Sequence, residues 1–170
     1  GEVTEARTII AGLYDRVLAL YPLSKFEGNI RRAMARIATD SGLVCGTLDT
    51  ARRAVEAGLT VYMYNFNIPW SIAREALGPS HASEISHVFG TPYMETDPKV
   101  ADVGKVMNAY WASFATSGDP NHDGAPTEWP RYQPDADDND KRIQFDPDYG
   151  VLDSFRKEEC QLWRDYTAAQ

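Results

Sequence analysis

The most informative segment of the chain is Leu77-Gly-Pro-Ser-His81-Ala-Ser-Glu84-Ile-Ser-His87-Val-Phe-Gly90, which comes shortly after the apolar run Val61-Tyr-Met-Tyr-Asn-Phe66. The apolar run predicts a buried strand, and the small residues on both sides of His81 predict a loop. A histidine has an unperturbed pKa of about 6.5, so it can take a proton from a hydroxyl and return it to a leaving group. The order of strand, loop and histidine makes His81 a candidate general base, with an ordinary surface or core histidine as the alternative.

The predicted strand covers residues 59–66 and is apolar on both alternating faces, with Val61 and Met63 on one face and three aromatic residues on the other. Such a strand suits the middle of a sheet that helices cover on each side. Residues 142–146 are the only other strong candidate strand. Because two strands alone are marginally stable in water, we expect the sheet to continue outside this chain. The predicted fold class is α/β.

Helices account for most of the remaining chain, because apolar residues recur there at a spacing of three and four. The predicted helices cover residues 3–21, 29–38, 47–57, 84–90, 97–118 and 152–167. The predicted inward faces consist of Ile30, Met34 and Ile37 in one helix and of Val100, Val103, Met107, Tyr110, Trp111 and Phe114 in another. Between the second and third helices, Thr39, Asp40 and Ser41 predict a turn or a cap.

Composition excludes several classes of function. The 170 residues carry a formal net charge of −8, whereas a protein that binds nucleic acid needs a clustered basic surface. No apolar run approaches the roughly 20 residues that span a bilayer, and the first residues do not resemble a signal peptide. The acidic loop at 135–140 lacks the ligand spacing of a calcium site, and no Cys-x-x-Cys occurs. We therefore expect no metal, no cofactor and no nucleic-acid partner.

A nucleophile is missing from the sequence. No Gly-x-Ser-x-Gly occurs anywhere in the chain, although a histidine base needs a group from which to take a proton. We therefore expect residues 1–170 to be one fragment of a single domain, with the nucleophile on another polypeptide or on an upstream segment. A free-standing helical protein is a further alternative, and the isolated central strand argues against it.

Five segments, in order along the chain, resemble the C-terminal third of the type-B carboxylesterase family, which includes cholinesterases and fungal lipases. The segments are residues 39–45, 61–66, 81–90, 110–121 and 129–130. The third segment resembles the family pattern His-Gly-x-Glu-φ-x-x-Val-Phe-Gly, except that Ala82 stands where many members have glycine. The resemblance implies the C-terminal part of an α/β-hydrolase fold.

The resemblance also implies an activity. It implies a secreted or extracellular enzyme, with a periplasmic location as an alternative, that hydrolyses small-molecule carboxylic esters through a Ser-Glu/Asp-His triad. His81 corresponds to the family histidine, and the serine and the acid lie upstream in the family. The implied partner is thus the N-terminal portion of the same esterase. Cys45 and Cys160 match a family disulfide. A catalytically inactive cholinesterase-like binding or adhesion module is the alternative function.

Three other residues are candidates for a role near this site. Glu84 is expected to be a buried carboxylate that fixes the histidine loop, or else a surface charge. His87 is expected to pack in the interior or to line the rim of the acyl pocket. Trp70 is expected to line the substrate gorge or to pack in the core. We expect His122, which lies in the acidic loop, to be solvated.

Overall fold

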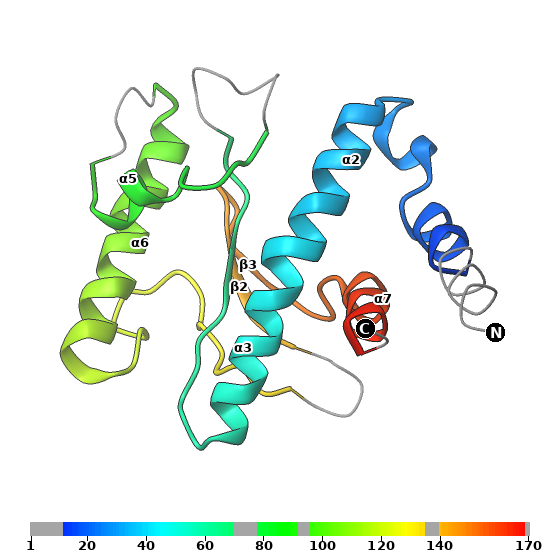
Figure 1. Ribbon diagram of the computed structural model, residues 1–170. Coiled ribbons are helices and arrows are strands. Elements are labelled where there is room, and N and C mark those ends of the chain that lie inside the picture. Colours follow the sequence, from blue (N-terminus) through cyan, green and yellow to red (C-terminus); the bar gives the residue numbers. More distant parts are fainter. Residues whose placement is uncertain (1–11, 70–77, 92–95, 135–139, 169–170) are drawn as a thin grey trace. The chain divides into compact units, whose positions relative to one another are not determined.

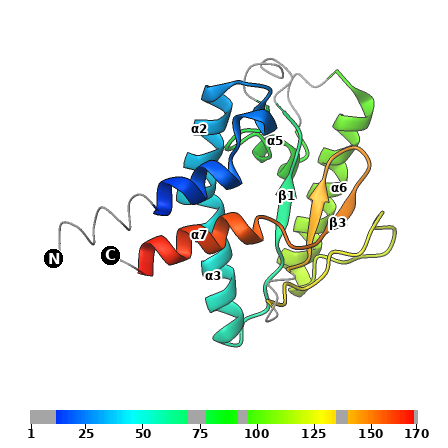
Figure 2. The ribbon, with the colours of Figure 1, turned by 90° about the vertical axis from the view of Figure 1, so that its right-hand side faces the viewer.

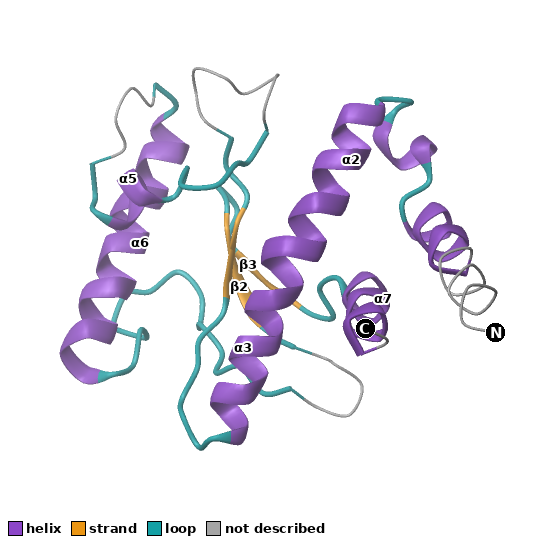
Figure 3. Cartoon of the chain, viewed as in Figure 1, coloured by secondary structure: helices purple, strands orange, loops and turns teal. Residues whose placement is uncertain are grey.

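The computed structural model describes residues 12–69, 78–91, 96–134 and 140–168 (Figure 1). The chain forms two compact units, Gly1–Ala57 with Ser154–Gln170 and Gly58–Asp153. The first unit is helical, and the second contains a small sheet with its helices (Figure 3). None of the helices within the described ranges is both long enough and apolar enough to cross a bilayer.

The first unit contains a helical segment over residues 12–20, a 3-10 helix at Leu23–Phe26, α2 at Ile30–Thr39, α3 at Cys45–Glu56 and α7 at Lys157–Ala168. Asn29 begins α2, because its side chain accepts hydrogen bonds from the backbone N–H groups of Arg31 and Arg32 at 3.1 and 3.2 Å. This satisfies two of the four donors that the first turn of a helix leaves free.

The turn predicted at Thr39, Asp40 and Ser41 is wrong. A π-helical turn at Asp40–Val44 joins α2 to α3, so that the helical backbone continues from one to the other. The Ser41 hydroxyl donates back to the carbonyl of Ala38 at 3.4 Å, which lets this polar residue stay inside a helix. The Asp40 side chain is completely buried and caps nothing; it is occupied by tertiary partners that local sequence does not reveal.

The predicted inward face of α2 also differs from the structure. Ile30 and Met34 were predicted to face inward, but both are exposed, with 63% and 64% of their surface accessible. The buried residue of α2 is Ala33. Helical periodicity identifies which side chains share a face, but not whether the chain itself supplies a cover for that face.

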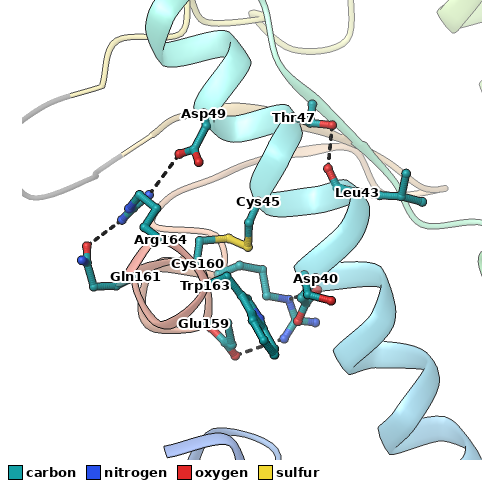
Figure 4. Close-up of a disulfide and its surroundings, with 12 residues drawn as sticks. Asp40, Leu43, Cys45, Thr47, Asp49, Glu159, Cys160, Gln161, Trp163 and Arg164 are labelled. Atoms are coloured by element: carbon teal, nitrogen blue, oxygen red, sulfur yellow. Dashed lines mark hydrogen bonds and ion pairs between the residues drawn. A yellow bond between two sulfur atoms is a disulfide. The ribbon is translucent and has the colours of Figure 1, made fainter. Parts of the chain in front are cut away.

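A disulfide joins Cys45, at the start of α3, to Cys160 in α7, as the resemblance implied (Figure 4). The two Cα atoms are 5.1 Å apart, within the usual range for such a bond. An ion pair between Asp49 and Arg164, at 3.6 Å, connects the same two helices. The last helix is therefore held to α3 by a covalent bond and a charge pair.

Beside the disulfide lies the buried carboxylate of Asp40. The Tyr21 hydroxyl donates to its Oδ2 at 3.1 Å, and the indole N–H of Trp163 donates to the Tyr21 oxygen at 3.1 Å. The guanidinium groups of Arg36 and Arg156 lie 3.9 and 3.8 Å from Oδ1. Burial raises the pKa of Asp40, and the two arginines oppose this shift. Burial also raises the pKa of Tyr21, so the phenol stays a donor.

The second unit contains a three-stranded sheet in the order β1-β2-β3, with β1 at Tyr64–Phe66, β2 at Arg142–Phe145 and β3 at Gly150–Leu152. The first pair is parallel, with Tyr64 opposite Ile143 and Phe66 opposite Phe145. The second pair is antiparallel. The two predicted strands are thus neighbours, and a third strand that the sequence did not reveal joins them.

Two boundaries differ from the prediction. Residues 59–63 were expected to be part of the strand, but regular pairing begins at Tyr64, and Tyr62 makes an isolated antiparallel bridge with Arg131. The final helix was expected from residue 152, but residues Gly150–Leu152 pair with β2 and the helix begins at Lys157. In both places the partner strand, rather than the local pattern, sets the boundary.

The long helix α6, at Pro98–Ser117, lies alongside the sheet (Figure 2). Asp97 caps it by accepting from the N–H of Lys99 at 3.0 Å, and Gly118 ends it at a φ of +78°. The core of this unit joins α6, β1 and β2 through Ile68, Val100, Val103, Met107, Tyr110, Trp129, Ile143 and Phe145. Phe114 was expected in this core but is 46% exposed, because it lies near the end of the helix.

We expect reduction of the Cys45–Cys160 bond to lower the free energy of unfolding by about 4 kcal/mol, because the bond closes a loop of 115 residues in the unfolded chain. Denaturant titration followed by tryptophan fluorescence, with and without reductant, measures the difference. Recovery of two alkylated thiols from the unreduced folded protein would contradict the assignment.

We expect Asp40→Ala to lower the free energy of unfolding by about 2 kcal/mol, because it removes a buried carboxylate that accepts from Tyr21 and lies beside the Arg36 and Arg156 guanidinium groups. Asp49→Ala is the matched control, since that carboxylate is 35% exposed and pairs with Arg164 near the surface. It should cost at most about 1 kcal/mol. Equal losses of unfolding free energy in the two variants would show that the buried position of Asp40 adds nothing to stability.

Candidate functional site

The segment that carries His81 forms a tight turn followed by the short helix α5 at Ile85–Val88. Ser83 fixes the turn: its hydroxyl and its backbone N–H both donate to the carbonyl of Ser80, at 2.7 and 3.1 Å. Ser83 itself is buried, with 6% of its surface accessible. A buried serine whose hydroxyl is satisfied within the turn gives the loop one defined conformation. Ser83 is not among the site residues that the sequence predicts.

His81 itself is exposed on this turn. The next residue, Ala82, has a φ of +69°, in the left-handed region. Alanine is strained in this region by about 1 kcal/mol or more, whereas glycine is not. This explains in physical terms why glycine suits the position after the histidine. The strained residue lies directly beside the predicted base.

His87 lies in a different environment from His81. It is buried, with 6% of its surface accessible, and its ring centroid is 5.0 Å from that of Phe66 in β1. Its Nδ1 lies 3.5 Å from the hydroxyl oxygen of Ser86. The two histidines of this segment therefore differ in burial. The His81 side chain is exposed to solvent, and the His87 ring packs α5 against the strand.

Glu84 immediately precedes α5 and is half-buried. Its charge acts on Tyr64 of β1, whose pKa is raised mainly by burial and further by this carboxylate. Among the described residues, no side-chain hydrogen bond joins Glu84 to His81. Trp70, the other candidate from the sequence, lies outside the described residues.

His122 differs from the expectation of a solvated side chain. It is half-buried, and its ring meets Tyr110 edge to face at a centroid distance of 5.3 Å. Its Nδ1 lies 3.0 Å from the carbonyl oxygen of Asp123. The acidic composition of the loop suggested solvent, but the apolar face of α6 below it attracts the ring. His122 is thus part of the packing of the second unit.

Comparison with known proteins places these features in a family. A family model described as "Carboxylesterase family" matches residues 7–163. Carboxylesterase 4A of Bos taurus is 31% identical over 140 residues, which cover 79% of this chain and 24% of that protein. The medium-chain fatty acyl-CoA hydrolase precursor of Anas platyrhynchos is 27% identical and is covered to 26%. The chain thus spans about a quarter of the length of these curated relatives.

A solved structure gives the same result. The crystal structure of a carboxylesterase from Geobacillus stearothermophilus superimposes with a TM-score of 0.67 and 26% sequence identity, over 88% of this chain and 31% of that one. This likeness confirms the predicted fold class, part of an α/β-hydrolase. Because the family model covers most of the chain, the protein belongs to the carboxylesterase family.

Proposed function

We propose that this chain contributes to a carboxylic-ester hydrolase and supplies His81 as the general base of its catalytic triad. The observation that carries the proposal is the position of His81 in a chain of the carboxylesterase family. His81 is exposed on a turn that leads into α5, and His87 packs this helix against β1. The nucleophilic serine and the triad acid would come from the rest of the family domain, which is the partner that this chain requires.

In this mechanism His81 takes the proton of the serine hydroxyl as the serine attacks the ester carbonyl. The protonated imidazole then donates that proton to the departing alcohol, which leaves an acyl-enzyme. His81 next removes a proton from water as the water attacks the acyl carbonyl. The protonated imidazole then returns that proton to the serine oxygen as the acyl–serine bond breaks, which releases the carboxylic acid. Each step requires an imidazole that is accessible and held in one place, which the exposure of His81 and the Ser83 hydrogen bonds support.

The residues near His81 have supporting roles in this proposal. Glu84 would orient the histidine turn from the start of α5, where its charge acts toward β1. Trp70, which lies outside the described residues, would line the substrate gorge or pack in the core. His87, being buried against Phe66, is better suited to packing than to contact with the acyl group.

A secreted or lumenal location follows as part of the same proposal. Disulfides persist mainly in oxidising compartments, and the Cys45–Cys160 bond ties together two helices of the first unit. The bond therefore supports an extracellular enzyme.

We expect His81→Gln to reduce ester turnover by at least several hundred-fold without unfolding the protein, because a triad loses most of its advantage when any member is removed. The substitution is polar, similar in size and at an exposed position. Hydrolysis of a short-chain p-nitrophenyl ester by the complete esterase is the measurement, with circular dichroism to confirm folding.

His87→Gln is the matched control for this test, since it makes the same change in the same segment. It should retain turnover within about tenfold, because packing on Phe66 is weakened but no proton transfer is lost. If the His87 variant is inactive and the His81 variant is not, the base has been assigned to the wrong histidine. If neither variant changes ester turnover, a catalytically inactive binding module replaces the esterase as the proposed function.

We expect Ala82→Gly to raise the free energy of unfolding by about 0.5–1 kcal/mol, because it relieves the strain at positive φ and this gain exceeds the entropy cost of a glycine. Ala35→Gly, at an exposed position inside α2, is the control and should lower it by about 1 kcal/mol. Denaturant titration of both variants measures the difference. A loss of stability in the Ala82 variant would show that the turn is not strained.

A further inference from the structure

We propose that Asn108 of α6 is a positioning residue: it holds α5, and with it the His81 turn, at a fixed place on the core of the second unit. The inference rests on the proposed function, because it requires His81 to be the base. Asn108 belongs to none of the motifs that carry the family resemblance, and sequence reasoning gave it no role.

The helix α5 is too short to hold itself in place. It contains four residues, and a helix of this length is unstable unless tertiary contacts support it. The His81 turn leads directly into it, so any movement of α5 is passed to the histidine.

The carboxyl end of α5 is closed by a Schellman motif. The N–H of Thr91 donates to the carbonyl of Ser86 at 2.8 Å, and the N–H of Gly90 donates to the carbonyl of His87 at 3.0 Å. Gly90 has the required positive φ of +67°. These bonds satisfy two of the last carbonyl groups of the helix and leave that of Val88 without a partner from α5 itself.

Asn108 supplies this partner. Its side-chain N–H group donates to the Val88 carbonyl at 3.0 Å, from a different helix. Gly90 lies next to Asn108, because a Cβ atom placed on this glycine would be at ordinary contact distance, 3.5 Å, from the Cβ of Asn108. Asn108 thus reaches the end of α5 through a hydrogen bond, at a place where the two helices lie close together.

The helix that carries Asn108 is itself fixed. Met107, the preceding residue, is completely buried in the core that α6 forms with β1 and β2. At the other side of α5, His87 packs on Phe66 of β1. Val88 of α5 also packs against that core. Apolar contacts therefore hold the short helix on the core, and Asn108 adds a hydrogen bond from α6 to its carboxyl end.

The position of a base matters more to catalysis than to folding. A displacement of about 1 Å can reduce a reaction rate by about a hundredfold, while a single exposed hydrogen bond contributes little to stability. Asn108 is exposed, so its removal should leave the protein folded. We therefore expect a loss in kcat that is out of proportion to any loss in stability.

The experiment compares Asn108→Ala and Asn108→Asp with the wild type in the complete esterase, with a short-chain p-nitrophenyl ester as the probe. The aspartate variant keeps the shape of the side chain but, when ionised, cannot donate to the Val88 carbonyl. Lys105→Ala is the control on the same helix; this exposed residue pairs only with Asp102 among the described residues, at 2.6 Å. Hydrogen exchange of the amides at 87–91 gives a readout independent of activity.

We expect both Asn108 variants to lower kcat about tenfold while KM changes less than twofold, with faster exchange at 87–91 and no change in the Lys105 variant. Unchanged kcat or unchanged exchange in Asn108→Asp would overturn the positioning role, as would a parallel loss in the control. His81→Gln is measured alongside. If it abolishes turnover, a negative Asn108 result leaves the proposed function intact; if it does not, both the function and this inference fail.

Discussion

The parallel pairing of β1 with β2 is the interaction on which the candidate site depends. It places Phe66 opposite Phe145 at a defined register, and both strands share a core with α6. His87 packs on Phe66, and Asn108 reaches α5 from α6. If the register of β1 changed by one residue, its aromatic side chains would move to the other face and α5 would lose its support.

The first unit is held together differently, by polar and covalent links. Cys45 and Cys160 join α3 to α7. The buried carboxylate of Asp40 accepts a hydrogen bond from the Tyr21 hydroxyl and forms ion pairs with two guanidinium groups. Such a group of charges is stabilising only when it is complete, because each buried member alone would have to be desolvated without compensation. The π-helical turn that begins at Asp40 allows the carboxylate to lie within this group without ending the helix.

The His81 turn contains a strained residue and is held by hydrogen bonds and by the packing of α5. Ala82 occupies a left-handed conformation that alanine disfavours, and the bonds from Ser83 to Ser80 hold the turn in that conformation. The packing of α5 supports the same conformation from outside the turn. This arrangement leaves His81 exposed while the residues on either side of it are fixed, which suits a group that must meet a partner outside this chain.

Residue patterns predict the α/β class, the caps of α6 at Asp97 and Gly118 and the strands β1 and β2, and the family resemblance predicts the disulfide. These depend on local residue preferences or on segments matched as a whole. Other features follow only from the three-dimensional fold: Asp40 is buried, β3 pairs with β2, and Asn108 meets Val88. Each of these depends on contacts between residues far apart in the chain, and such contacts leave no periodic pattern in the sequence.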